Sequence, residues 1–390
     1  MMTMRININR LVTTLAAALY YLALVIVNQF GGRVVSLIWL LAVGFAAFVG
    51  VWGRKLHFRW SEVGLIVMII LTGMLNIHFI GGTTYINQGL IICFFLVSIM
   101  LSSPYVNENI ILALFFLNVI VVIYRFSTVG FRGMIYTSSS SNFVSVQLLY
   151  PLVVYYCIVE RNNKRIRVFP ALCAWVLSLL SRGRGGILAT TILLVGIVLL
   201  AYNKAMEIKK IIAILVGIIA IGVCALNAEK IIEKVNNSIV SEYFRDRGME
   251  SVRTEIWKDY IKSLDSEKEV LLGGDITNTY AGMYYSGNVH NSFLNIHIHN
   301  GLIMVLVVLL LVVCAFYRGV KWRKWVYLVC MGAMFLRAFT DNVFWPAYGT
   351  PVLFFLLLWL PPRYRLCSKN TTVNERTLLD SIEEVSCEQK

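Results

Sequence analysis

The residues of this sequence that could do chemistry begin with two arginines in a glycine-rich turn. Arg182 and Arg184 stand in the segment Ser-Arg-Gly-Arg-Gly-Gly, residues 181 to 186, between the apolar runs 168 to 180 and 187 to 200. Charged side chains are costly beside hydrocarbon, and short loops on the outer side of a membrane normally avoid Lys and Arg. We therefore interpret the two arginines as a site for an anionic ligand, and not as residues that set the orientation of the chain in the membrane.

His290 is the strongest candidate for acid–base chemistry. It ends a long polar stretch and precedes an apolar run that starts near residue 292. Imidazole changes charge between about pH 5 and 8, so a histidine at the aqueous end of a membrane span can act as a general base. On a helix, one stripe would carry His290, Leu294, His297 and Gly301, with His297 about 10 Å deeper. We interpret His297 and His299 as structural hydrogen-bonding groups.

The elements around these residues are predicted to be membrane-spanning helices. Of the 390 residues, 58% are hydrophobic, and apolar runs repeatedly approach the roughly 20 residues that cross about 30 Å of hydrocarbon. We therefore predict an all-α polytopic membrane protein of about 12 transmembrane helices, with one membrane domain over residues 1 to 362. The predicted spans are residues 11 to 28, 34 to 52, 63 to 80, 88 to 102, 109 to 125, 142 to 159, 167 to 181, 186 to 202, 211 to 227, 292 to 316, 325 to 340 and 343 to 360.

The distribution of basic residues predicts which side each loop faces. With both termini in the cytoplasm, most Lys and Arg fall in cytoplasmic loops, as the positive-inside rule requires. The arginine turn and one long loop, residues 228 to 290, are then extracytoplasmic. The net charge of +14 is mainly this orientation signal, and the scattered cations form no stripe for nucleic acid. The cytoplasmic clusters are Arg54, Lys55, Arg59; Arg161, Lys164, Arg165, Arg167; Lys204, Lys209, Lys210; and Arg318, Lys321, Arg323, Lys324.

Neither the cysteines nor the C-terminal segment indicates a second chemistry. All eight cysteines are expected in spans or in the tail and form no CxxC pair, so we predict no disulfide framework, no metal site and no cofactor. Residues 363 to 390 are polar and are predicted to form a disordered cytoplasmic tail.

The long outer loop is predicted to be functional, since loops of this length in compact proteins usually are. Arg253 and Trp257 share one edge of an expected amphipathic helix at the bilayer interface, whose apolar positions are Val252, Ile256, Tyr260 and Leu264. Tyr280, Tyr284 and Tyr285 follow among small and polar residues. Such rings stack on sugars, and interfacial anchoring explains them equally well.

The second half of the sequence resembles the superfamily of O-antigen ligases and polymerases, the Wzy-type and WaaL-type membrane glycosyltransferases of bacteria. The resemblance rests on sparse motifs in order: the Ser-Arg-Gly-rich turn at 181 to 186, Arg253-Thr254-Glu255-Ile256-Trp257, Leu272-Gly273-Gly274, and His290-Asn291 with Leu294. Residues 1 to 165 are similar only in hydropathy. The sequence departs from the pattern at Asn300, where similar proteins often have an acidic residue, and at Ile303-Met304, where they have another small residue.

The resemblance implies a donor saccharide linked to undecaprenyl pyrophosphate, attacked at its anomeric carbon by a sugar hydroxyl outside the bacterial cytoplasmic membrane. A guanidinium binds two phosphate oxygens at once, which suits a leaving group that gains negative charge. Arg182, Arg184 and Arg253 would hold the diphosphate, and His290 would take the acceptor proton. We prefer Arg182 as the family's arginine and keep Arg184 as a second contact. The other predicted substrate contacts are Asn291, Trp257 and Tyr284.

Other functions fit parts of the same pattern. The leading expectation is a polymerase of O-antigen, capsule or exopolysaccharide repeat units, with membrane lipids, a flippase and a chain-length regulator as candidate partners. A ligase that moves finished glycan to another acceptor fits the same motifs. A flippase or transporter is less favoured, since no internal repeat is visible and the polar residues gather at one face.

Arg337 and Asp341, at the outer end of the predicted span 325 to 340, have two interpretations. They could join the same site. A local ion pair between residues four apart, which lowers the cost of an arginine near the membrane, is the simpler interpretation.

Overall fold

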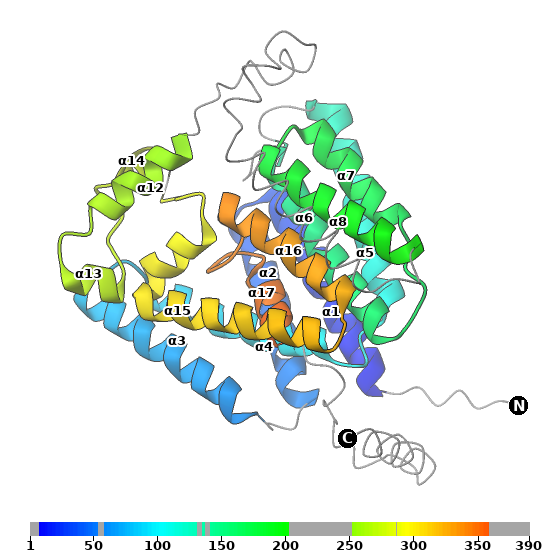
Figure 1. Cartoon of the computed structure of the whole chain (residues 1–390), viewed down its shortest axis with the longest axis horizontal. Helices are drawn as coiled ribbons and strands as arrows, with labels where there is room; N and C mark the ends of the chain where they lie inside the picture. The colour runs from blue at the N-terminus through cyan, green and yellow to red at the C-terminus, as the bar shows by residue number, and fades with distance from the viewer. Residues whose placement is uncertain are drawn as a thin grey trace, which may run out of the picture.

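The computed structural model describes residues 8–53, 58–130, 135–136, 141–202, 252–285 and 287–358, and every regular element in these ranges is helical (Figure 1). Within them, eight helical segments are long and apolar enough to cross a membrane. They contain α1 (Ile8–Phe30), α2 (Arg33–Gly53), α3 (Trp60–Phe79), α4 (Tyr85–Ser102), α5 (Glu108–Val129), α6 (Val144–Arg161, after the 3-10 turn Ser141–Phe143), α8 (Arg184–Tyr202) and α15 (Ser292–Lys321). The prediction of a helical membrane protein is confirmed at this level.

The remaining helices are shorter. α7 (Phe169–Ser181) and α16 (Trp325–Thr340) are apolar, and α17 (Thr350–Leu358) follows them in the core. Three small helices belong to the predicted outer loop: α12 (Val252–Lys262), α13 (Glu267–Leu272) and α14 (Tyr280–Tyr285). In Figure 1 these three lie together on one side of the molecule, next to α3 and the first part of α15 and away from α5 and α7.

Helices occupy the predicted spans from residue 11 to 202 and from 292 to 340. Since α7 and α16 are shorter than a full span, the count of about 12 transmembrane helices stays a prediction. The predicted span 211 to 227, the loop residues 228 to 251 and the predicted tail lie outside the described residues. The last predicted span, 343 to 360, begins its helix only at Thr350. Before it the chain makes a compact turn, because the Thr350 hydroxyl accepts the backbone N–H groups of Trp345 and Ala347.

Helix α6 forms the centre of the bundle. Every residue from Val144 to Val159 is buried, although the helix contains Pro151. It packs against α5, α7, α8, α16 and α17. A helix that is apolar on all sides is expected in the interior. Because α6 packs against both α8 and α16, it fixes the positions of these two helices, whose ends contribute to the site described below.

The outer helices expose apolar side chains in stripes. On α1, the exposed leucines are Leu11, Leu15, Leu19 and Leu22, three or four residues apart. Soluble proteins rarely expose continuous apolar surface of this kind, and lipid-facing helices do so by necessity.

Helix α15 is interrupted, which the sequence analysis did not predict. Gly301 has φ +73°, and a Cβ there would lie 2.1 Å from the carbonyl oxygen of Leu271, so only glycine fits. The buried Asn300 amide holds the break by donating to Thr72 Oγ1 (2.9 Å) and accepting from Trp345 Nε1 (2.8 Å). Figure 1 shows the two parts of α15 meeting at an angle.

The apolar face of α12 is buried inside the protein. The predicted helix is present, but its apolar face packs against the protein, whereas the sequence analysis expected that face to contact a bilayer. Ile256 and Tyr260 pack with Ala281, Val289 and Ile298 in a second small core. Packing this face against the chain on either side of His290 removes it from water completely, which is more favourable than leaving it partly exposed at an interface. The same packing fixes the outer loop to the start of α15.

Candidate functional site

The ends of several helices meet around Asp341, directly after α16. The Arg337 guanidinium donates to Asp341 Oδ2 at 2.9 Å, and Arg253 Nη2 lies 3.7 Å from the same oxygen. The other carboxylate oxygen, Oδ1, lies 3.1 Å from Nδ1 of His290. The local pair of Arg337 with Asp341 is therefore confirmed, and the same carboxylate also joins Arg253 to His290.

This carboxylate is ionised. Burial alone would raise the pKa of Asp341, but the Arg337 charge, the hydrogen bond from His290 and the Arg253 charge outweigh burial and hold the pKa well below its usual range. Arg253 and Arg337 bring two positive charges to this single negative charge, so this part of the cluster is cationic.

His290 is held in one orientation with one ring nitrogen available. A carboxylate can only accept, so Nδ1–H donates to Asp341 and the neutral ring keeps its lone pair on Nε2. Among the described residues, Nε2 has no hydrogen-bond partner. The ring of Tyr285 stands edge-to-face at 5.8 Å, and the imidazole keeps partial exposure at 22%. A histidine oriented by a carboxylate in this way can accept a proton from a bound hydroxyl.

His290 does not lie on helix α15, which corrects the predicted stripe. The helix begins at Ser292, and His290 precedes it in the left-handed region with φ +51°. Arg182 is also left-handed, with φ +57°, as the C-cap of α7. Non-glycine residues held there cost about 1–3 kcal/mol each and cluster at functional sites. Both of the strongest sequence candidates thus have this conformation.

The glycines of the arginine turn let it pack against the cluster. A Cβ on Gly185 would lie 2.4 Å from Thr340 Oγ1, and one on Gly186 would lie 2.2 Å from Ser145 Oγ. Ser145 accepts from Arg337 Nε at 3.2 Å, and Thr340 Oγ1 accepts from Arg337 Nη1 at 3.2 Å. The turn therefore rests on the residues that hold Arg337 in place.

Gly186→Ala should weaken the site through these contacts. The added methyl forces Ser145 away from Arg337 or separates α8 from α6, an overpacking cost of about 1–3 kcal/mol. The matched control is Gly64→Ala in α3, where a Cβ meets nothing within 4 Å. The melting temperature of Gly186→Ala should fall below that of Gly64→Ala. Equal melting temperatures would show that the close contact of Gly186 with Ser145 does not hold α8 against α6.

The two arginines of the turn occupy different places. Burial lowers the pKa of the Arg253 guanidinium, the Asp341 charge opposes this, and Arg337 and Arg184 lower the pKa further. Arg184 precedes Gly185, which packs against Thr340, and the Thr340 carbonyl accepts a hydrogen bond from Arg253. Arg184 therefore begins α8 beside Arg253, and its side chain is exposed. Arg182 is half-buried at the end of α7. The structure brings Arg184, Arg253 and His290 to one cluster and places Arg182 two residues from it along the turn.

Two predicted substrate contacts have structural partners. The indole of Trp257 donates to the carbonyl of Val289 at 2.8 Å and packs edge-to-face on Phe339. The side-chain oxygen of Asn291 caps α15 by accepting the N–H groups of Phe293 and Leu294. Both residues therefore hold the chain on either side of His290.

The tyrosines of α14 form a series of rings that ends at the imidazole. Tyr284 is 68% exposed and contacts Tyr280, with ring centroids 4.8 Å apart. Tyr280 contacts Tyr285 at 5.8 Å, and Tyr285 contacts His290. Aromatic faces arranged in this way form a surface on which sugar rings can stack.

The sequence matches no protein-family model and has no significant match among curated proteins.

His297 has a structural role, as the sequence analysis expected. Its Nε2–H donates to the carbonyl of Val270 at 2.8 Å, which leaves Nδ1 to accept from the Tyr260 hydroxyl at 2.6 Å. Both ring nitrogens are occupied within the protein, so His297 connects α15 to the outer loop.

Sequence analysis named Asp341 as one residue that could join the site, but it did not predict that this carboxylate orients His290 or which groups support it. Ser292 Oγ donates to the carbonyl of Asp341 at 2.9 Å and accepts from Val343 N. The carbonyl of Asn142 accepts from Arg337 at 3.0 Å. Backbone carbonyls give no sequence signal; the signal that singled out Asp341 was an acidic residue at the end of an apolar helix, four positions after an arginine. In the described residues, no group of three or more His, Cys, Asp or Glu side chains could hold a metal ion.

Proposed function

We propose that this protein is a glycosyltransferase that polymerises undecaprenyl-pyrophosphate-linked repeat units into a surface polysaccharide at the outer face of the bacterial cytoplasmic membrane. One observation carries the proposal: the His290 imidazole is oriented by Asp341 beside the guanidinium of Arg253. A general base next to an anion-binding arginine is what displacement of a sugar from a pyrophosphate requires. The resemblance of the surrounding motifs supplies the substrate class.

In the proposed step, an acceptor sugar hydroxyl donates its hydrogen bond to Nε2 of His290. Its oxygen bonds to the anomeric carbon of the donor as the bond from that carbon to the pyrophosphate oxygen breaks. The proton passes to Nε2, and undecaprenyl pyrophosphate leaves with the electron pair. Asp341 stabilises the imidazolium that forms, because its charge is held by two arginines.

The arginines divide into supporting and substrate-binding groups. Arg337 is 1% exposed, and its donors are taken up by Asp341, Asn142, Ser145 and Thr340. It therefore fixes the carboxylate. Arg253 keeps 27% exposure although it also donates to the Thr340 carbonyl. Arg253, Arg184 and Arg182 are the residues we assign to the diphosphate.

The short helices suit a lipid-linked substrate. α7 has 13 residues and α16 has 16, and at 1.5 Å per residue both end roughly 6 to 10 Å short of crossing about 30 Å of hydrocarbon. Arg182 and Asp341 follow these two ends directly. The pyrophosphate of a membrane-embedded carrier lies at the bilayer surface. Helices that end below that surface leave room for the headgroup above Arg182 and Asp341, so the donor need not leave the bilayer.

The proposal requires the arginine turn and the outer loop to face away from the cytoplasm. In a variant whose native cysteines are replaced by serine, Asn278→Cys should react with an impermeant maleimide in intact cells, and Lys321→Cys only after the membrane is opened. Both positions are exposed, and the expectation comes from the Lys and Arg asymmetry of the loops. Labelling at position 321 and not at 278 in intact cells would reverse the orientation and remove the substrate from the site.

Deletion of the gene tests the function. Loss of the polymer ladder, with single repeat units left on their lipid carrier, is the result for a polymerase. A complete ladder that stays on its carrier would identify a ligase, and repeat units confined to the inner leaflet would identify a flippase. Complementation by the wild type and failure by an equally expressed Arg253→Gln would connect the phenotype to the site.

A further inference from the structure

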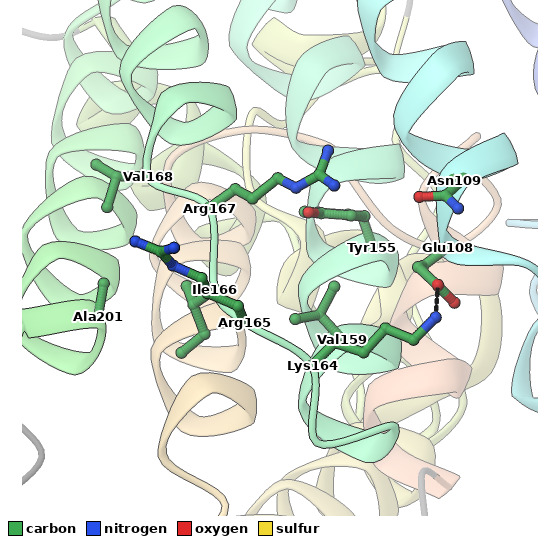
Figure 2. A pocket seen from close by; sticks show the side chains of 10 residues that line it. All are labelled: Glu108, Asn109, Tyr155, Val159, Lys164, Arg165, Ile166, Arg167, Val168 and Ala201. Carbon is green, nitrogen blue, oxygen red and sulfur yellow. Dashed lines mark hydrogen bonds and ion pairs between the residues drawn. The ribbon is translucent and has the colours of Figure 1, made fainter.

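A polar cavity lies at the opposite end of the bundle from His290. Its volume is about 690 Å³, and Figure 2 shows it between the start of α5, the end of α6, and the loop that leads into α7. The lining also includes Ala201 near the end of α8. Both α7 and α8 run from one site to the other, because Arg182 and Arg184 stand at their opposite ends. The cavity is therefore separate from the site described above.

The end of α6 and the loop before α7 together carry four basic residues, and two of them have structural partners. Arg161 donates to the carbonyls of Ser102 and Ser103, at 2.9 and 3.2 Å. Lys164 pairs with Glu108, which Figure 2 marks inside the cavity. These contacts join the loop to the ends of α4 and α5 and leave no net charge on the Lys164–Glu108 pair.

The other two basic residues line the cavity without such partners. Within the described part of the chain, neither Arg165 nor Arg167 makes a side-chain hydrogen bond or an ion pair. In Figure 2 the Arg167 guanidinium extends toward Tyr155, while Arg165 extends toward the side of Val168 and Ala201. The cavity therefore has two positive charges that no side chain in the described residues neutralises, and they border it from two sides.

The apolar surface next to the cavity indicates what kind of anion would bind. Val168 lines the cavity, and an exposed stripe of α7 begins at the next residue, with Phe169, Leu172 and Val176 at 62, 41 and 41% exposure. Phe169 also stacks on Phe116 of α5. A charged cavity that opens onto a lipid-facing apolar stripe matches a molecule with a phosphate head and an acyl tail.

We propose that this cavity binds the headgroup of an anionic phospholipid, with Arg165 and Arg167 at its phosphate and the acyl chains along the exposed stripe of α7. Arginine suits this role because its planar guanidinium offers several donors to phosphate oxygens. The proposed orientation would place this cavity beside the cytoplasmic leaflet, which is rich in anionic lipids. Basic pockets between helices on that side of a membrane bind anionic lipid headgroups. The binding itself does not depend on the proposed enzymatic activity.

The test uses the purified full-length protein in phosphatidylcholine nanodiscs, with phosphatidylglycerol titrated in and the bound lipid counted by native mass spectrometry. Each arginine near such a headgroup contributes roughly a fivefold factor in affinity. Arg165→Gln with Arg167→Gln should therefore weaken phosphatidylglycerol retention about 25-fold. Arg167→Lys should keep only part of the affinity if the phosphate contact is geometric, and all of it if only surface charge matters.

The control is Lys321→Gln, which removes a cation from the same face but outside the cavity. It should change retention less than about twofold. Equal losses in Lys321→Gln and the double variant would show a general surface potential and overturn the proposal. Retention unchanged in a double variant with wild-type melting temperature would overturn it as well. If inorganic phosphate at millimolar concentration displaced phosphatidylglycerol from the wild type, the cavity would be a site for free phosphate, and the lipid assignment would be wrong.

Discussion

His290→Ala should slow turnover at least about 100-fold, the lower end of what a positioned general base contributes, while the variant still binds lipid-linked substrate. The imidazole is the group with a free lone pair beside the arginines, and its other nitrogen is engaged by Asp341. Alanine leaves Arg253 and the turn in place, so binding of the diphosphate should persist. Single-turnover rates and substrate binding, measured on the same purified protein, separate the two effects.

His297→Ala is the matched control, because it removes an imidazole from the same segment. His297 is bonded at both nitrogens, to Tyr260 and to Val270. Its loss leaves two buried groups without partners, at about 1–3 kcal/mol each in stability. Turnover per folded molecule should stay within a few-fold of wild type. A larger rate loss in His297→Ala than in His290→Ala would move the base from His290 to the deeper histidine.

Asp341→Asn should reduce turnover by about 10²- to 10⁴-fold, since an amide can donate to Nδ1 and favour the wrong imidazole tautomer. It should also cost stability. Arg337 is 1% exposed, and a buried charge that loses its partner costs about 3–5 kcal/mol. Turnover and melting temperature should both fall.

The double variant Arg337→Gln with Asp341→Asn separates these two causes. The double variant removes both buried charges, so most of the decrease in melting temperature caused by Asp341→Asn should be reversed. Turnover should stay low, because His290 still lacks its carboxylate. Recovery of turnover together with stability would show that Asp341 is only a structural partner of Arg337.

The pH dependence follows from the direction of the pKa shift at Asp341. Its folded-state pKa lies below the unfolded value of about 3.9, so the carboxylate stabilises the fold at all pH values above that. The stabilisation is lost only as the pH falls through the lower, folded-state pKa. Any loss of activity between pH 7 and 5 in a still-folded protein must therefore come from another group.

The sequence predicted the long helices and the motif residues because both leave local signals. Hydropathy alone places α1 to α8, and an arginine between two apolar runs is conspicuous wherever it occurs. The structure brings Arg184, Arg253 and His290 into one cluster, although these three residues are far apart along the chain.

The parts that could not be predicted depend on contacts between distant segments. The break at Gly301 follows from the close approach of Leu271, and the carboxylate that orients His290 comes from the end of α16. A helical stripe predicted His290 on α15, whereas Asn291 caps the helix one residue later. The apolar face of α12 was identified correctly, but periodicity cannot distinguish a lipid surface from a second core.

The most direct measurement uses substrate that the cell itself provides. Lipid-linked single repeat units extracted from the deletion strain are incubated with the purified wild-type protein. The proposed function predicts products of two or more repeats on one carrier, with one undecaprenyl pyrophosphate released for each new glycosidic bond. The same incubation with His290→Ala should yield at least about 100-fold less product in the linear phase. Recovery of the single repeats unchanged, from wild-type protein that is folded and binds them, would contradict the account.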